Sequence, residues 1–109
     1  MGLTEKEVEQ YDELGYVVKE GVYSYDDLEP LRAGLTGAIQ EKCDELISAG
    51  TLDRDFSESS FETRLTELHR HDADAAHEVL MAIWSGRFHG LGILTALRHC
   101  HLIDCIEDL

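Results

Sequence analysis

The sequence predicts a mainly α-helical protein with about five or six helices and one short strand near residues 16–19. Apolar residues recur at spacings of three and four over most of the chain, which is the pattern of amphipathic helices. Helix-capping patterns precede several of these segments, and only one short run consists of β-forming residues. The single Pro and the absence of low-complexity tracts argue against disorder. Because the 109 residues contain no linker and no internal repeat, we expect one helical domain over residues 1–109.

The first predicted helix covers residues 5–14. Thr4 and Glu7 form a capping-box pattern, in which the Thr hydroxyl accepts from a backbone N–H and the Glu carboxylate reaches back. Gly15 stands where a left-handed C-cap is needed. The β-forming run YVV follows directly and is the predicted strand. A lone strand cannot pair its backbone groups with itself, so we expect it to pair with something outside these 109 residues.

A long helix is predicted over residues 25–49. Ser24 and Asp27 form a second capping pattern at its start. Gly34 and Gly37 weaken a helix by about 1 kcal/mol each relative to Ala, so we expect them to pack closely against another backbone. The apolar stripe of this helix consists of Leu28, Leu31, Leu35, Ile39, Cys43 and Leu46.

Four shorter helices are predicted in the remainder of the chain. Ser59 and Glu62 repeat the capping-box pattern before a helix over about residues 60–70. Asp72 can cap a further helix near residues 73–85. The runs ILTAL and LIDCIEDL each predict one more helix. The residues predicted to be buried in the helix near residues 73–85 are Ala76, Val79, Leu80, Ile83 and, as a large anchor, Trp84.

The charge balance excludes some classes of partner. Asp and Glu number 23 against 9 Lys and Arg, and the net charge of -14 disfavours nucleic acid and anionic membrane surfaces as partners. The sequence contains no secretory signal pattern and no apolar run of the roughly 18 residues that a membrane span needs. Three cysteines are an odd number, which fits free thiols in a reducing compartment. These features predict a cytoplasmic protein.

Two clusters in the sequence contain residue types that can bind metal, and ordinary packing or solvation is the alternative interpretation of each. His99, Cys100, His101 and Cys105 fall within residues 99–105, but structural zinc sites show paired spacings with a second pair elsewhere. Core packing explains these cysteines better, although the sequence leaves open whether the cluster binds metal. His69, His71 and His77 alternate with acidic residues at a predicted helix junction, where solvated cap residues are the simpler interpretation. We therefore assign no catalytic, cofactor-binding or metal-binding residue.

Residues 11–35, about a quarter of the chain, resemble the N-terminal region of the phytanoyl-CoA dioxygenase family. In that family an aromatic, a few polar residues, Gly, an aromatic and a β-branched pair are followed by a Ser-led helix. The tail LRHCHLIDCIEDL also looks like the helix that precedes the family's core, with His101 where many members carry Pro. Residues 36–96 share only helical character. The residues that carry the main resemblance are Tyr11, Gly15, Tyr16, Val17, Val18, Ser24, Leu28, Leu31 and Arg32.

Members of this family are iron(II)- and 2-oxoglutarate-dependent oxygenases that hydroxylate small organic substrates on a double-stranded β-helix core. The resemblance implies that this chain is an N-terminal helical subdomain, packed on a β-helix core that would follow Leu109 in a longer oxygenase. Iron(II) and 2-oxoglutarate are then cofactors of the full-length protein. None of the 6 His residues is followed two positions later by Asp or Glu, so this chain alone lacks the His-x-Asp…His iron site and should be inactive.

A different class of function remains as the alternative. The chain could be a free-standing acidic helical module that binds a basic partner or forms a homodimer through exposed apolar helix faces.

Overall fold

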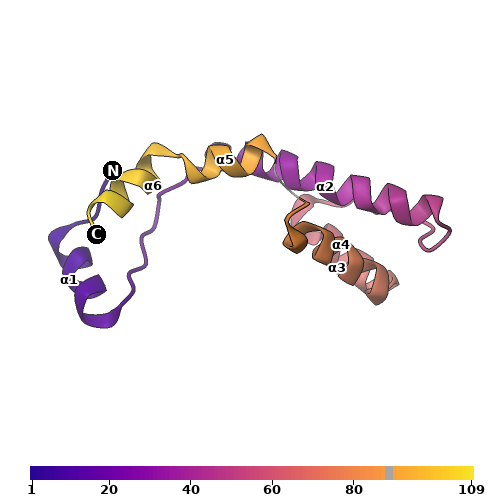
Figure 1. Cartoon of the computed structure of the whole chain (residues 1–109), viewed down its shortest axis with the longest axis horizontal. Coiled ribbons are helices and arrows are strands. Elements are labelled where there is room, and N and C mark those ends of the chain that lie inside the picture. The colour runs from indigo at the N-terminus through magenta and orange to yellow at the C-terminus, as the bar shows by residue number, and fades with distance from the viewer. Residues whose placement is uncertain (88–89) are drawn as a thin grey trace.

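The computed structural model describes residues 1–87 and 90–109, and this part of the chain is mainly helical, with six α-helices (Figure 1). A 3-10 turn, η1 (Asp26–Leu28), precedes α2, and a π-helical turn, η2 (Ile83–Arg87), follows α4. The α-helices are α1 (Glu5–Leu14), α2 (Glu29–Ser48), α3 (Phe61–His71), α4 (Ala73–Ala82), α5 (Leu91–Leu97) and α6 (Cys100–Glu107).

The molecule is elongated, with extents of 55 × 26 × 23 Å. Helices α1 and α6 and both ends of the chain lie at one end, while α3 and α4 lie beside α2 at the other (Figure 1). The radius of gyration is 17.9 Å, whereas a compact chain of this length would have about 13 Å. The chain therefore buries less of its surface than a compact domain of its size.

Among the described residues, the hydrophobic core cluster lies where α2, α3 and α4 meet. The C-terminal half of the predicted α2 stripe supplies Ile39, Cys43 and Leu46, which are all buried. Leu68 of α3 and Val79 of α4 are fully enclosed opposite them. The loop between α2 and α3 and the start of α4 complete the core with Leu52, Phe56, Ala75 and Ala76.

Helix α5 packs on the N-terminal half of α2, and a glycine makes this close approach possible. A Cβ atom built on Gly92 would overlap the Pro30 carbonyl oxygen and lie 2.7 Å from its carbon. The predicted close packing at Gly37 is wrong, because a Cβ atom there would meet nothing within 4 Å. The glycine that allows two helix backbones to touch is therefore on α5, not on that turn of α2.

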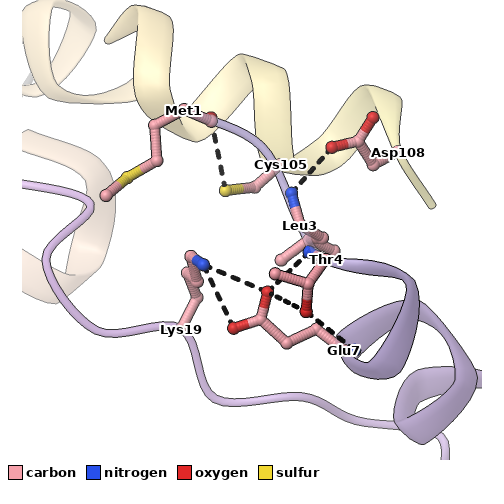
Figure 2. Close-up of polar contacts among 7 residues, drawn as sticks. All are labelled: Met1, Leu3, Thr4, Glu7, Lys19, Cys105 and Asp108. Carbon is pink, nitrogen blue, oxygen red and sulfur yellow. Dashed lines mark hydrogen bonds and ion pairs between the residues drawn. The ribbon is translucent and has the colours of Figure 1, made fainter.

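Polar contacts hold the α1 end together (Figure 2). The predicted capping box is present: the Glu7 carboxylate accepts from the Thr4 N–H, and the Thr4 hydroxyl accepts from the Glu7 N–H. Lys19 donates to both oxygens of the Glu7 carboxylate at 3.0 and 3.1 Å. The Leu3 N–H donates to the Asp108 carboxylate at 2.7 Å, which ties the N-terminal segment to α6. Helix α1 itself contains no buried residue.

The strand predicted near residues 16–19 is wrong. No strand occurs within residues 1–87 or 90–109, and Tyr16 and Val18 are 58% and 73% exposed. The chain contains no second β-forming run with which residues 16–19 could pair, so this segment does not form a strand. Packing on a β-helix core gains no support from this mainly helical, strand-free part of the chain.

The C-terminal helices differ from expectation on their buried faces. Leu80 and Trp84 were predicted to be buried, but they are 40% and 75% exposed. Ala76 and Val79, which were predicted on the same inner face, are confirmed as buried, and Ala75 joins them there. The capping box predicted at Ser59 is also wrong, because the Ser59 hydroxyl donates to Glu67 instead. The predicted cap at Asp72 is confirmed by a 3.0 Å bond from the Ala75 N–H.

Candidate functional site

The predicted His and Cys cluster at residues 99–105 holds neighbouring segments together. His99 Nε2 lies 3.2 Å from Asp27 Oδ2, and the His99 ring packs against Tyr23 with centroids 5.0 Å apart. His101 Nδ1 lies 3.3 Å from the carbonyl oxygen of Val22. The Tyr23 hydroxyl donates to the Ala96 carbonyl at 2.6 Å. This cluster attaches the extended segment before α2 to the junction of α5 and α6.

The cysteines of this cluster do not join its imidazoles in a common site. Cys100 is exposed and Cys105 is buried. The Cys105 thiol lies 3.9 Å from the carbonyl oxygen of Met1, toward the N-terminal segment (Figure 2). Within the residues that the structure describes, no group of three His, Cys, Asp or Glu side chains could hold a metal ion.

The second predicted cluster divides between two places. His71 Nε2 lies 2.6 Å from Asp53 Oδ1, and this hydrogen bond is the main reason that the pKa of Asp53 lies below its usual range. His69 and His77 instead line a groove of about 320 Å³ between α3 and α4, together with Leu65 and Leu80. The three imidazoles therefore do not converge.

The exposed apolar side chains of α5 and α6 form the first candidate functional surface. We call this set the α5–α6 apolar surface. Both helices lie along one edge of the molecule (Figure 1). None of the helices in the described ranges is both long and apolar enough to span a membrane. The members and their exposed fractions are Ile93 (37%), Leu94 (46%), Leu97 (62%), Ile103 (39%) and Ile106 (58%).

The total accessible surface is large for the mass. The chain exposes 7439 Å², whereas a compact monomer of 12.3 kDa would expose roughly 6,100 Å². The difference of about 1,300 Å² exceeds the roughly 800 Å² that each partner buries in a standard protein interface. This excess follows from the elongated shape of the molecule.

A groove of about 790 Å³ between α2 and the start of α3 is the second candidate site, which we call the α2–α3 groove. Arg64 lines it and is only 4% exposed. Arg64 Nε donates to the backbone oxygen of Asp55 at 3.0 Å, and its Nη2 donates to Gln40 Oε1 at 2.7 Å. Arg32 lines the same groove and stacks over the Tyr25 ring, with 3.8 Å from its Cζ atom to the ring centroid.

Gln40 connects Arg64 to an ionised carboxylate. Its Nε2 donates to Asp55 Oδ2 at 2.8 Å, and this hydrogen bond is the largest cause that lowers the pKa of Asp55 to about 2. Sequence analysis missed this network. Arg64 lies four residues before the buried Leu68, so helical spacing could have placed it on the inner face of α3. An arginine at that position is ordinarily assigned to solvent, which explains the omission.

The chain matches no protein-family model, no curated protein and no solved structure.

Proposed function

We propose that this chain is a helical scaffold that docks on a larger protein body through the α5–α6 apolar surface. In the form that the sequence resemblance implies, that body is the core of a phytanoyl-CoA dioxygenase-like, iron(II)/2-oxoglutarate-dependent oxygenase that hydroxylates a small organic substrate. The observation that carries the proposal is the exposure of large apolar side chains on α5 and α6, led by Leu97 at 62%. Exposed apolar side chains that cluster on a soluble protein mark interaction surfaces, and these side chains belong to two consecutive helices.

The extended segment after α1 supports the same interpretation. Tyr16 and Val18 are more than half exposed, and the backbone between them takes part in no ladder within the described residues. This segment lies at the same end of the molecule as α6 (Figure 1). A partner that covers the α5–α6 apolar surface is therefore also placed to reach these unpaired backbone groups.

The residues of this chain do not fit the iron site of such an oxygenase. No His-x-Asp or His-x-Glu pair occurs in the sequence, and no cluster of three ligand side chains exists in the described part. The facial triad requires two His and one carboxylate. We therefore derive no chemical step here, and the proposed role of this chain is to support and cover the body that performs the reaction.

Amide hydrogen exchange can test the docking proposal. The natural product that contains this sequence is compared with the isolated 109-residue chain. Amides of α5 and α6 should exchange more slowly in the natural product, because a covering partner removes them from water. Equal exchange in both samples would overturn the proposal.

A matched pair of substitutions makes the test specific. Ile103→Glu places a charge on the α5–α6 apolar surface, whereas Ile47→Glu makes the same change on α2 at 37% exposure, close to the 39% of Ile103. Ile103→Glu should abolish the added protection in the natural product, because a buried unpaired charge is unfavourable. Ile47→Glu should leave the added protection of the α5 and α6 amides unchanged.

A second candidate function is a free-standing acidic module that binds a basic partner. The observation that favours it is the net charge of -14, which would attract a cationic surface over several ångströms. The mass of the natural product separates the two proposals. A native product of 109 residues that binds a basic protein, with an affinity that falls steeply with salt, supports the module.

A further inference from the structure

The buried guanidinium of Arg64 has hydrogen-bond acceptors but no direct counter-ion. Its two protein acceptors are a backbone carbonyl and an amide oxygen, and both are neutral. Among the described residues, no carboxylate oxygen lies within 4.0 Å of its nitrogen atoms. Buried charges in proteins are normally paired as well as hydrogen-bonded. Arg64 therefore lacks a directly contacting anion, although no buried side-chain nitrogen or oxygen among the described residues is left without a hydrogen-bond partner.

Neither nearby ionisable group supplies that anion directly. Burial raises the pKa of the Cys43 thiol, even though the Arg64 guanidinium acts in the opposite direction, so this thiol is neutral near pH 7. Asp55 is ionised, but its carboxylate accepts from Gln40 and from the Ser57 N–H. It attracts Arg64 electrostatically and through the intervening Gln40 amide, but it makes no direct contact with the guanidinium.

Arg32 adds a second cation to the α2–α3 groove. Its ion pairs with acidic side chains are long. Its ion pairs with Glu29 and Glu62 span 3.6 and 3.8 Å, and these glutamates are 63% and 60% exposed. Exposed pairs at such distances contribute little and exchange readily with water or another anion. The Arg32 guanidinium is nevertheless positioned, because it donates to the Tyr25 carbonyl at 2.9 Å and stacks on its ring.

The rest of the α2–α3 groove suits an organic ligand. Tyr25 and Phe61 contribute aromatic surface, while Gly37 leaves open space beside them. The Ser60 hydroxyl pairs with the Thr63 hydroxyl at 2.8 Å and does not cap α3, so the helix keeps its partial positive charge toward the groove. These features combine apolar contact with attraction for negative charge.

We propose that the α2–α3 groove binds a small organic anion, with its carboxylate or phosphate group against Arg64 and Arg32 and its apolar part against Tyr25 and Phe61. Glu29 and Glu62 line the same groove and balance the two arginines, so affinity depends on displacing their weak ion pairs. This site does not depend on the scaffold role, because none of its residues belongs to the α5–α6 apolar surface.

The direct test is a titration of the isolated chain followed by NMR. Phenylacetate and phenyl phosphate serve as anionic probes, and phenylacetamide is the neutral control. Both the Arg64 side-chain Nε–H signal and the backbone amides of Phe61 and Glu62 should shift saturably with an anionic probe and not with phenylacetamide. Binding of either anion supports the site and identifies its preferred acid group. If neither anion produces saturable shifts up to its solubility limit, the proposal is overturned.

Three variants distinguish a specific site from general attraction. Arg32→Gln should weaken binding at least about tenfold, because it removes a charge-assisted contact while leaving the Arg64 network intact. Gly37→Leu should fill the groove and weaken binding by a similar factor in a helix that accepts leucine well. Arg54→Gln removes the same charge from a side chain that pairs with Glu58 outside the groove, so binding should be unchanged. Equal weakening by Arg32→Gln and Arg54→Gln would overturn the proposal.

Discussion

The substitution Gly92→Ala tests the contact between α5 and α2 directly. The added methyl carbon would overlap the Pro30 carbonyl oxygen and lie 2.7 Å from the carbonyl carbon and 3.1 Å from the Leu31 Cα atom. Favourable contacts between carbon atoms require about 3.5–4.0 Å. The obstacle is backbone, which cannot rotate away as a flexible side chain can. The two helices must therefore separate by about 1 Å to admit one methyl group.

Two opposing effects set the size of the change. Overpacking of this kind destabilises by about 1–3 kcal/mol, and a backbone obstacle places this case near the upper end. Alanine is favoured over glycine within a helix by about 1 kcal/mol, which offsets part of that penalty. The expected net loss in the free energy of unfolding is about 2 kcal/mol. For a chain of this length, that corresponds to a decrease in Tm of roughly 8–10 °C.

Gly37→Ala is the matched control for this prediction. It makes the same chemical change in α2, at a position where a Cβ atom would meet nothing within 4 Å. Only the helix preference then remains, so Gly37→Ala should stabilise the chain by about 0.5–1 kcal/mol. Thermal unfolding followed by far-UV circular dichroism measures both variants. If Gly92→Ala matched or exceeded the Tm of the parent chain, the close packing of α5 on α2 would be refuted.

Two further predictions concern the core and the polar network beside it. Leu68 is fully buried, so Leu68→Ala should lower the free energy of unfolding by about 3 kcal/mol in a urea titration, whereas Leu94→Ala at 46% exposure should lower it by less than about 1 kcal/mol. The Asp55 pKa is about 2 in the folded chain, below its value of 3.8 in the unfolded chain, so its contribution is full above pH 4 and is lost as the pH falls toward 2. Solvent screening at this half-buried site limits the contribution to about 1 kcal/mol. Asp55→Asn should remove that part of the pH dependence in urea titrations at successive pH values, and an unchanged acid slope would contradict it.

Local features of the fold could be predicted because they depend on residues close together in the sequence. The capping box of Thr4 and Glu7, the left-handed Gly15 and the cap at Asp72 all involve contacts within one helical turn. The stripe of α2 was also predictable, since its buried members recur at spacings of three and four. Such patterns constrain the backbone whatever lies beyond the helix.

Features that depend on which surfaces meet could not be predicted in this way. Trp84 was expected to be an anchor because it is large and apolar, yet it lies in the η2 turn after α4 and is 75% exposed. The groove at Arg64 requires the start of α3 to lie against α2, and no spacing in either helix indicates that arrangement. The segment at residues 16–19 has strong β propensity but no partner, and propensity without a partner does not produce a strand.

The hydrophobic core lies at the α2–α3–α4 end of the molecule, and the opposite end is where the proposed partner would bind. Helices α2, α3 and α4 enclose Leu68 and Val79 by themselves, so their part of the fold does not need another protein. At the opposite end, α1 has no buried residue and the segments are joined by polar contacts such as the one between Lys19 and Glu7. The Lys19–Glu7 contact is only partly buried and has no hydrophobic core beneath it, so this end should open first in the isolated chain. A partner on the α5–α6 apolar surface would supply the apolar burial that this end lacks. The α2–α3 groove, by contrast, is built on the part of the molecule that already has its core, which is why anion binding there should persist whether or not the partner is present.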